Sequence, residues 1–485
     1  MGFNGYFIQF TTGFEFYERW YKHKLSTAKE PEEFTREMAE AYTADVIAEI
    51  KKRGLILQRY GHGWTCRAFG LPDNGWHKFA YEDIPESFHK ICAELGGERK
   101  CYHNVPLETQ LCYSDPTVID AIVKEFVRTA EADPACDVFH FWLGDEYNNT
   151  CECENCRKGN YTDHYVNLVN AITDRFIELG IDKKIVFIAY LNSAYPPEIV
   201  KLKHPEYAVL MFAPITRTYG ETFPDGFRIK EVPEYKINGF TQPAGADENL
   251  AYLYGWMQVF CGDAVDFDYH LMWDHMLDAG GEGIAKVLHT DISHFDSLGL
   301  NGVIRWQLQR NTFPTSIAMT AMAKTMWNKN TDFDALRREL YAASFGKEHA
   351  ERLCEYFSLL SGAFDIAVIR RQKKYDRETV KANMRDAIAA MAEIREIAEQ
   401  QKNCKNDCHR TSWELLVLHA QMYSRIAEAI IAKLDGDHAR FEALRDEATD
   451  FAFANEDALQ TVVDCHFFRR MMVERLNLTA SGNRE

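Results

Sequence analysis

Seven short runs of apolar, β-branched and aromatic residues recur along the first two thirds of the chain, each bounded by polar or glycine-containing segments. Such runs predict buried strands of a parallel sheet. Apolar residues at helical spacing separate most of them and predict helices. The expected strands are residues 3–10, 55–60, 138–143, 185–190, 207–212, 264–271 and 302–308, and the expected helices are residues 32–53, 116–132, 165–177, 247–259 and 285–298. This alternation favours a TIM-like (β/α) barrel over an open sheet.

The pattern changes near residue 328, after which only helical spacing is found. Five segments, residues 333–346, 349–364, 378–401, 412–434 and 457–478, carry apolar residues three and four positions apart. We therefore expect a barrel domain over residues 1–327 and an all-α helical domain over residues 328–485. Seven strands are one fewer than a closed eight-stranded barrel contains.

Composition and charge narrow the class of partner. The chain has 46% apolar and 26% charged residues, which is ordinary for a globular protein. Its net charge of −18 disfavours nucleic acid and anionic membrane surfaces, because both need a basic footprint. No apolar run reaches the ~20 residues that cross a bilayer, and the start, MGFNGYFIQF, lacks the pattern of a signal peptide. Thirteen cysteines without a regular framework fit reduced thiols, so we expect a cytoplasmic protein.

The strand at residues 138–143 ends in the most informative stretch, Gly144-Asp145-Glu146. Neighbouring side chains of a strand point to opposite faces. Asp145 and Glu146 can therefore face one cavity only if the backbone bends, which Gly144 permits. A solvated pair in a turn is the plain alternative. The buried character of the strand and the position at its carboxyl end favour a catalytic pair.

Other polar and aromatic residues follow the remaining strands, where a barrel places its substrate site. They are His62, Asn192, Tyr269, Trp273 and Trp306. Each alone is more often a packing residue, but together with the two acids they describe a cleft suited to a carbohydrate. The sequence contains no glycine-rich phosphate loop, serine nucleophile elbow or HExxH helix.

Three cysteines, Cys151, Cys153 and Cys156, follow the acidic pair within a span of six residues. A structural zinc ion needs four ligands, so a fourth would come from Cys112, Cys101 or Cys136. A reduced thiol cluster that stabilises the loop is the alternative. We expect no cofactor for catalysis itself.

Four segments, Asn4 within GFNGYFIQF, Gly61-His62, LCYSDP at 111–116 and FHFWLGDE at 139–146, occur in the same order as landmarks of glycoside hydrolase family 20 β-hexosaminidases. With CECENC and YLNSAYPP added, residues 1–325 resemble the barrel of the family 163 endo-β-N-acetylglucosaminidases and their bacterial relatives. In the family 20 pattern, the strand that matches residues 3–10 is the second of the barrel. The resemblance therefore implies a barrel that lacks its first strand.

The resemblance also implies a retaining, substrate-assisted mechanism on a β-linked N-acetylhexosaminide, an exception to the usual two-carboxylate scheme. The substrate's 2-acetamido oxygen would attack the anomeric carbon. Glu146 would then act as general acid and base, and Asp145 would orient and stabilise the acetamido group. Tyr269 would bind the acetamido oxygen, and Trp306 would form a wall of the sugar pocket.

Two alternatives remain open. An inverting glycosidase, for example one acting on uronic acids, would use Glu146 as the acid and a distant carboxylate such as Asp268 as the base, ~6.5–9.5 Å away. A non-catalytic glycan-binding protein would bind sugar without turnover.

Overall fold

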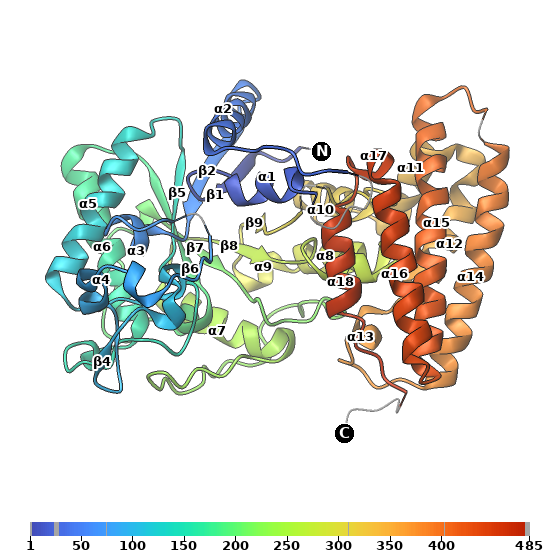
Figure 1. The fold of residues 1–485 in the computed structure, drawn as a ribbon. Coiled ribbons are helices and arrows are strands. Elements are labelled where there is room, and N and C mark those ends of the chain that lie inside the picture. The colour runs from blue at the N-terminus through green and yellow to red at the C-terminus, as the bar shows by residue number, and fades with distance from the viewer. Residues whose placement is uncertain (1, 24–28, 74, 309, 402, 481–485) are drawn as a thin grey trace.

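The computed structural model describes residues 2–23, 29–73, 75–308, 310–401 and 403–480. Seven parallel strands form one sheet in the order β1-β2-β5-β6-β7-β8-β9, which curves into a nearly closed barrel (Figure 1). They are β1 (Gly5–Gln9), β2 (Ile56–Gly61), β5 (Val138–Phe141), β6 (Lys184–Ala189), β7 (Ala208–Phe212), β8 (Asp263–Asp268) and β9 (Gly302–Arg305). Every predicted strand is present, so the expected TIM-like barrel is confirmed.

Helices on the outside of the sheet connect most of these strands (Figure 1). They are α2 (Arg36–Lys52), α5 (Pro116–Ala132), α6 (Tyr161–Leu179), α7 (Gly245–Val259), α8 (Glu282–Ser293) and α9 (Phe295–Leu298). The start of α5 shows why prediction succeeded here. Pro116 occupies the first turn, and the Asp115 side chain accepts a hydrogen bond of 2.8 Å from the Thr117 backbone N–H. The single helix predicted over residues 285–298 is instead divided at His294 into α8 and α9.

Both faces of strand β5 pack against other parts of the protein. Phe139 and Phe141 point outward, and their rings lie 5.9 and 5.3 Å from the ring of Phe126 in α5. His140 and Trp142 point the opposite way, and their rings lie 5.5 Å from each other. Both faces of the strand are therefore buried, as in other parallel sheets covered by helices.

The segment between β2 and α5 carries no periodic pattern of apolar residues over residues 67–106. It contains short elements, namely α3 (Trp64–Arg67), α4 (Glu86–Ile91) and the hairpin β3 (Glu94–Leu95) and β4 (Glu98–Arg99). These elements are too short to produce a periodic pattern in the sequence. The Glu152 N–H donates a hydrogen bond of 2.8 Å to the Glu94 carbonyl, so that the hairpin lies beside the loop that follows β5.

The last third of the chain is helical and packs beside the barrel, as the orange and red ribbons of Figure 1 show. Its longer helices are α10 (Ile317–Trp327), α11 (Phe333–Phe345), α12 (Ala350–Ala363), α14 (Arg377–Gln400), α15 (Asp407–Leu434), α16 (His438–Ala454) and α18 (Cys465–Glu474). Helix α16 was not predicted, because small residues such as Ala448 and Ala452 form much of its buried face. The helix expected over residues 457–478 is instead the short α17 (Glu456–Leu459) followed by α18. The division into a barrel domain and a helical domain between residues 327 and 328 stays a prediction.

Strands β1 and β9 are the two edges of the sheet, and the helical region links the segments that follow them. Arg19 lies in α1 (Phe14–Tyr21), just after β1, and Arg310 lies just after β9. Both guanidinium groups bind the same Asp464 oxygen, at 2.7 and 2.8 Å. Asp464 precedes α18, so a single carboxylate connects both edges of the barrel to the helical region.

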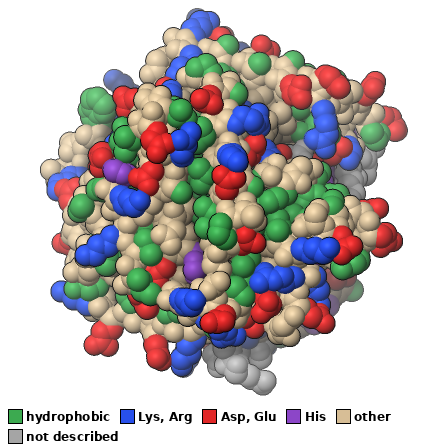
Figure 2. Space-filling view, turned by 90° about the vertical axis from the view of Figure 1, so that its left-hand side faces the viewer, with side chains coloured by type: hydrophobic (Ala, Val, Ile, Leu, Met, Phe, Trp, Pro, Cys, Tyr) green, Lys and Arg blue, Asp and Glu red, His purple; other side chains and the backbone are tan. Residues whose placement is uncertain are grey.

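Acidic and basic side chains are interspersed over the face shown in Figure 2. None of the helices in the described parts of the chain has the length and apolar character that crossing a membrane requires.

Candidate active site

The backbone bends sharply after β5, and a glycine makes the bend possible. A Cβ atom on Gly144 would lie 2.7 Å from the Thr109 carbonyl oxygen, a distance that real Cβ atoms do not adopt. The Asp145 N–H then donates a hydrogen bond of 2.8 Å to the Leu107 carbonyl. The bend permitted by Gly144, which the sequence suggested, is therefore used to pack the loop against residues 107–110.

The Asp145 carboxylate is approached by three side chains from different segments. The Trp76 indole Nε1–H donates a hydrogen bond of 2.8 Å to Asp145 Oδ2. The Tyr190 phenol lies close enough to the same carboxylate to feel its charge, and His62 Nε2 lies 3.4 Å from Oδ1. His62 is itself oriented by a 2.7 Å contact between its Nδ1 and the Leu143 carbonyl. These contacts fix the position and orientation of the carboxylate.

Two tyrosines, the half-buried Tyr190 and the buried Tyr269, lie within the electrostatic influence of Asp145. Burial, and then the negative charge of Asp145, raises the pKa of Tyr190 well above its ordinary value. The same two causes, in the same order, raise the pKa of Tyr269. Both phenols therefore stay protonated near neutral pH and keep a hydroxyl hydrogen to donate.

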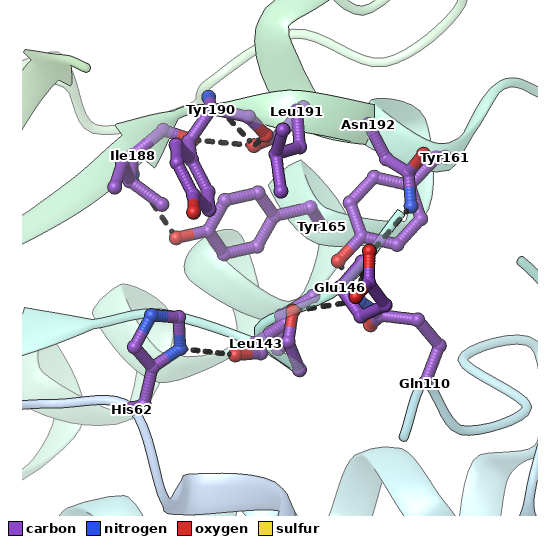
Figure 3. Close-up of a pocket in the computed structure, with 12 residues that line it drawn as sticks. His62, Gln110, Leu143, Glu146, Tyr161, Tyr165, Ile188, Tyr190, Leu191 and Asn192 are labelled. Atoms are coloured by element: carbon purple, nitrogen blue, oxygen red, sulfur yellow. Dashed lines mark hydrogen bonds between the residues drawn. The ribbon is translucent and has the colours of Figure 1, made fainter. Parts of the chain in front are cut away.

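Glu146 lines a pocket at the carboxyl ends of β2, β5 and β6 (Figure 3). Its Oε1 accepts a hydrogen bond of 2.9 Å from the Tyr147 N–H, and within the described residues its carboxylate forms no ion pair. The pocket holds about 270 Å³ of empty space, its open mouth included. Its lining comprises His62, Gln110, Leu143, Gly144, Glu146, Tyr161, Tyr165, Ile188, Tyr190, Leu191, Asn192 and Ser193.

Gln110 holds the backbone of the acidic pair. Its Nε2 donates to the carbonyl oxygens of Gly144, at 2.7 Å, and Glu146, at 3.1 Å. Its Oε1 accepts hydrogen bonds from the hydroxyls of Tyr113, at 2.8 Å, and Tyr161, at 3.0 Å. Both polar atoms of the Gln110 amide are therefore hydrogen-bonded, and they hold the backbone of the loop in place.

The structure brings some of the predicted site residues into this pocket and places others beside it. His62, Glu146 and Asn192 line the pocket, and Asp145 adjoins it. The Tyr269 ring stacks on Trp273, with ring centres 5.0 Å apart and planes 11° from parallel. Trp306 follows β9, and its backbone N–H donates a hydrogen bond of 3.2 Å to the Asp268 carbonyl. Among the described residues, Trp306 is not part of the pocket lining.

Sequence reasoning missed Trp76, which contacts Asp145 directly. Trp76 lies in the segment between α3 and α4, where no periodic pattern marks it. It is 45% exposed to solvent. Gln110 was missed for a similar reason, since a glutamine in an irregular segment carries no recognisable motif. Only the position of LCYSDP, which begins one residue later, drew attention to this part of the chain.

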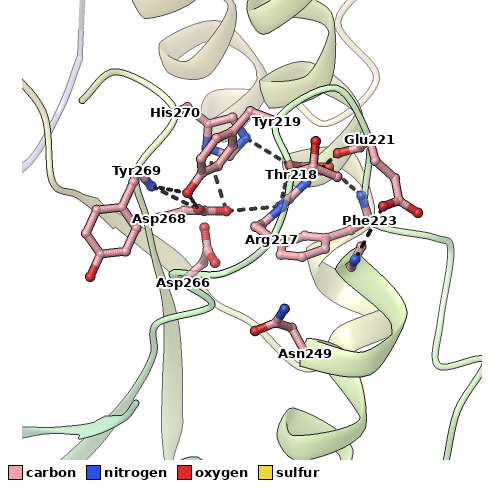
Figure 4. Close-up of polar contacts among 12 residues, drawn as sticks. Arg217, Thr218, Tyr219, Glu221, Phe223, Asn249, Asp266, Asp268, Tyr269 and His270 are labelled. Carbon is pink, nitrogen blue, oxygen red and sulfur yellow. Dashed lines mark hydrogen bonds and ion pairs between the residues drawn. The ribbon is translucent and has the colours of Figure 1, made fainter. Parts of the chain in front are cut away.

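A cluster of buried charges lies behind Tyr269, between the ends of β7 and β8 and helix α8 (Figure 4). Arg217 Nη1 is 2.9 Å from Asp268 Oδ2 and 2.9 Å from Asp291 Oδ2, and all three side chains are fully buried. Arg305 Nη1 is 2.6 Å from Asp266 Oδ2. Burial, together with the adjacent Asp268 charge, raises the pKa of Asp266 to about 8 despite Arg305. Near neutral pH the cluster therefore balances two guanidinium groups with two carboxylates.

Asp268 is used entirely within this cluster. Its Oδ1 accepts hydrogen bonds from the Tyr219 hydroxyl, at 2.6 Å, and from the Tyr269 N–H, at 2.8 Å. With no exposed surface and with both oxygens bonded, it is poorly suited to activating a water molecule in the cleft. Its geometry is that of a residue that positions Tyr269.

The cysteines of the loop after Glu146 come together with one further thiol. The sulfur atoms of Cys112, Cys151, Cys153 and Cys156 all lie within 4.8 Å of one another. Of the three fourth partners considered from the sequence, the structure supplies Cys112. Cys101 instead contacts Thr109 Oγ1 at 3.2 Å, and Cys136 contacts the Val138 carbonyl at 3.2 Å. The four thiols are a donor set that a soft metal ion could use.

Comparisons with known proteins give a matching family model and matches among solved structures. A family model described as a domain of unknown function, DUF4838, matches residues 22–358. A mutant of an O-GlcNAc hydrolase from Thermobaculum terrenum is a solved structure similar to this chain at a TM-score of 0.35 and 9% identity, over 98% of this chain and 94% of that one. No curated protein matches the sequence.

Proposed function

The chain belongs to the DUF4838 family, whose description states no activity, and from the geometry of its pocket we propose that it is a glycoside hydrolase. We propose further that it cleaves a β-linked N-acetylhexosaminide with retention of configuration, by the substrate-assisted route. The observation that carries this proposal is the difference between the environments of two adjacent carboxylates, Asp145 and Glu146. Asp145 is contacted by Trp76 and His62, whereas Glu146 faces the pocket without an ion-pair partner in the described chain.

This inequality suits the two roles that the mechanism requires. The acetamido oxygen of the substrate attacks the anomeric carbon, so that the enzyme needs no nucleophile of its own. Asp145 orients the acetamido N–H and stabilises the positive charge of the oxazolinium intermediate, a task that requires a fixed carboxylate. Glu146 donates its proton to the departing glycosidic oxygen and afterwards removes a proton from water, a task that requires access to the pocket.

The surroundings of the acids support a sugar as substrate. Tyr269 remains a hydroxyl donor beside Asp145 and can bind the acetamido oxygen. Trp273 stacks on the Tyr269 ring and limits its movement. His62, Asn192 and Gln110 add hydrogen-bonding groups around a small pocket whose remaining wall is aromatic and aliphatic. A few directed polar groups on an apolar lining are typical of small-ligand sites.

The test is hydrolysis of β-N-acetylglucosaminides, as aryl glycosides and as a complex-type N-glycan, by wild type, Asp145→Asn and Glu146→Gln. We expect turnover by wild type and a fall of at least about 100-fold in both variants. Glu146→Gln should recover activity on aryl glycosides with good leaving groups, because these need no proton from the enzyme. Glu152→Gln is a matched control, since Glu152 lies on the same loop and is bonded to Asn238. An inert wild type, or variants equal to wild type, would refute the proposal.

A further inference from the structure

We propose that Cys112, Cys151, Cys153 and Cys156 bind one structural zinc ion, and that this ion fixes the loop that carries Asp145 and Glu146. The inference concerns a second site on the molecule, distinct from the pocket. Its metal content can be measured without any substrate, so that it stands or falls independently of the proposed glycosidase activity.

The spacing of the four sulfur atoms is that of a tetrahedral thiolate site. Zinc to sulfur bonds of ~2.3 Å in a tetrahedron place neighbouring sulfurs ~3.8 Å apart. Cys112 Sγ lies 3.7 Å from Cys153 Sγ and 3.9 Å from Cys156 Sγ. Cys151 completes a group in which every sulfur is within 4.8 Å of every other. The side chains thus converge on one point, as ligands of a single ion do, and are not arranged as separate pairs.

The groups around the sulfurs provide the positive potential that a tetrathiolate site needs. Zinc with four thiolates carries a net charge of −2, which backbone N–H groups and cations can offset. The Glu94 N–H donates to Cys151 Sγ at 3.3 Å. Arg99 Nη1 lies 3.8 Å from the same sulfur and is held there by a 2.7 Å hydrogen bond to the Cys92 carbonyl. Ser114 Oγ lies 3.1 Å from Cys156 Sγ and can donate its hydroxyl hydrogen to a thiolate.

The local packing gives a physical reason for a metal at this position. The four cysteines form a small buried cluster of their own with Ala93, separate from the main hydrophobic core. The segments that meet there are the hairpin β3–β4, residues 110–114 and residues 151–158, none of which contains a long element. Thiols alone bury little apolar surface. A bound ion supplies the stabilisation that such short segments lack.

The site is coupled to the acidic pair through two short stretches of chain. Gln110 binds the Glu146 backbone carbonyl, and Cys112 lies two residues further along. On the carboxyl side of the loop, Cys151 lies five residues after Glu146. Between Glu146 and Cys151, Asn149 Nδ2 donates a hydrogen bond of 2.8 Å to the Glu108 carbonyl. A zinc ion would therefore tie the carboxyl side of the loop to Cys112, while Gln110 holds the amino side by hydrogen bonds to Gly144 and Glu146, and it would restrict the movement of Glu146.

Formation of the site is a simple exchange of protons for metal. Zn²⁺ forms four bonds to sulfur, and each thiol that enters as S–H releases its proton to solvent, so that no oxidant or reductant takes part. The competing possibility is oxidation of these thiols to disulfides. It makes the opposite prediction, because disulfide formation removes two thiols per bond and leaves no thiolate donors for a metal.

The experiment is a metal and thiol inventory of the full chain, purified in the presence of zinc and without chelating tags. Elemental analysis counts zinc per chain, and alkylation under denaturing conditions counts free thiols among the thirteen cysteines. Replacement of zinc by Co²⁺ tests the ligands, since cobalt in a tetrahedral thiolate site shows strong sulfur-to-metal charge-transfer absorption. Amide hydrogen exchange over residues 144–156, before and after zinc removal, tests the effect on the loop.

We expect one zinc per chain, thirteen alkylated thiols after zinc removal and denaturation, the cobalt thiolate spectrum, and faster exchange of the loop without metal. The paired variant Cys112→Ser and Cys156→Ser should reduce zinc retention against a chelator at least about 10-fold. Cys101→Ser and Cys136→Ser, buried cysteines outside the cluster, should retain the full amount. Wild type without zinc and without the cobalt spectrum, a disulfide among the four cysteines, or unchanged zinc in the paired variant would each overturn the proposal.

Discussion

The indole nitrogen of Trp76 donates a 2.8 Å hydrogen bond to Asp145 Oδ2, across 69 residues of sequence. Trp76 belongs to the irregular segment before α4, whereas Asp145 follows strand β5 of the barrel. A residue that is 45% exposed thus reaches inward to a carboxylate whose side chain is 17% exposed. This contact makes the segment around Trp76 part of the active site under the proposed function.

Replacing Trp76 with phenylalanine keeps an aromatic ring and removes the hydrogen bond. Because Asp145 must hold one orientation to stabilise the intermediate, we expect kcat/KM to fall about tenfold, corresponding to one hydrogen bond to a charged group. The melting temperature should hardly change, since the side chain is partly exposed. Steady-state kinetics and thermal unfolding measure the two effects. Trp327→Phe, at an 86% exposed position, is the control and should alter neither.

Asp268 should behave as a structural residue and not as a catalytic base. Asp268→Asn removes the charge that faces the buried Arg217 guanidinium, so we expect a loss of about 3 kcal/mol in unfolding free energy. Urea unfolding measures it. Glu86→Gln, which breaks an exposed ion pair with Lys90, should leave stability nearly unchanged. Inversion at the anomeric carbon by wild type, together with a stable Asp268→Asn variant that lacks activity, would instead favour the inverting mechanism.

The unfolding free energy should decrease in mild acid. Burial lowers the pKa of His140, His275 and His419 to about 3, whereas an unfolded histidine titrates near ~6.5. Between these values the unfolded chain binds protons that the folded chain does not, so stability present above pH ~6.5 is lost as the pH falls toward ~3.

Each such histidine should remove about 2 kcal/mol between pH 7 and pH 5. Urea unfolding at both pH values measures the loss. In His419→Gln, which cannot titrate, the difference between the two pH values should be smaller by about this amount, even if the variant is less stable at pH 7. An identical pH dependence in wild type and variant would contradict the assignment.

The carboxylate of Asp464 should contribute to closure of the barrel. Asp464→Asn removes the ion pairs to Arg19 and Arg310 but keeps a side-chain oxygen for the Phe467 N–H at the start of α18. We expect a loss of about 1–3 kcal/mol in unfolding free energy, since Arg310 is mostly buried and Arg19 is only partly so. Asp464→Ala, which also removes the cap, should lose about 1 kcal/mol more. Equal stability of wild type and Asp464→Asn would show that the two ion pairs contribute nothing.

The barrel could be predicted because its strands carry local signals. The run from Val138 to Leu143 is apolar except for His140, and the structure shows that Phe141 packs on α5 while Trp142 points inward. The acidic pair could be predicted because it follows this run directly. The start of α5 is marked locally by a proline and its preceding aspartate, whose capping role depends only on neighbouring residues.

Features that depend on distant contacts could not be predicted in this way. Trp76 has no pattern that ties it to Asp145, and Gln110 acquires its role only when the loop folds over it. Asp268 was a candidate base for the inverting alternative, but Arg217, 51 residues away, holds it in the interior. Cys112 was one of three candidates for the fourth thiol, and only the fold selects it.

The claim that the substrate's own acetamido group is the nucleophile can be tested with aryl glucosaminides that carry N-acetyl, N-fluoroacetyl, N-difluoroacetyl and N-trifluoroacetyl groups. Fluorine withdraws electrons from the carbonyl oxygen without changing the leaving group. The account predicts that kcat/KM falls steeply with each fluorine, and that the β-glucoside without an acetamido group is not hydrolysed. Rates that do not depend on fluorine, or hydrolysis of the plain β-glucoside at a comparable rate, would contradict it.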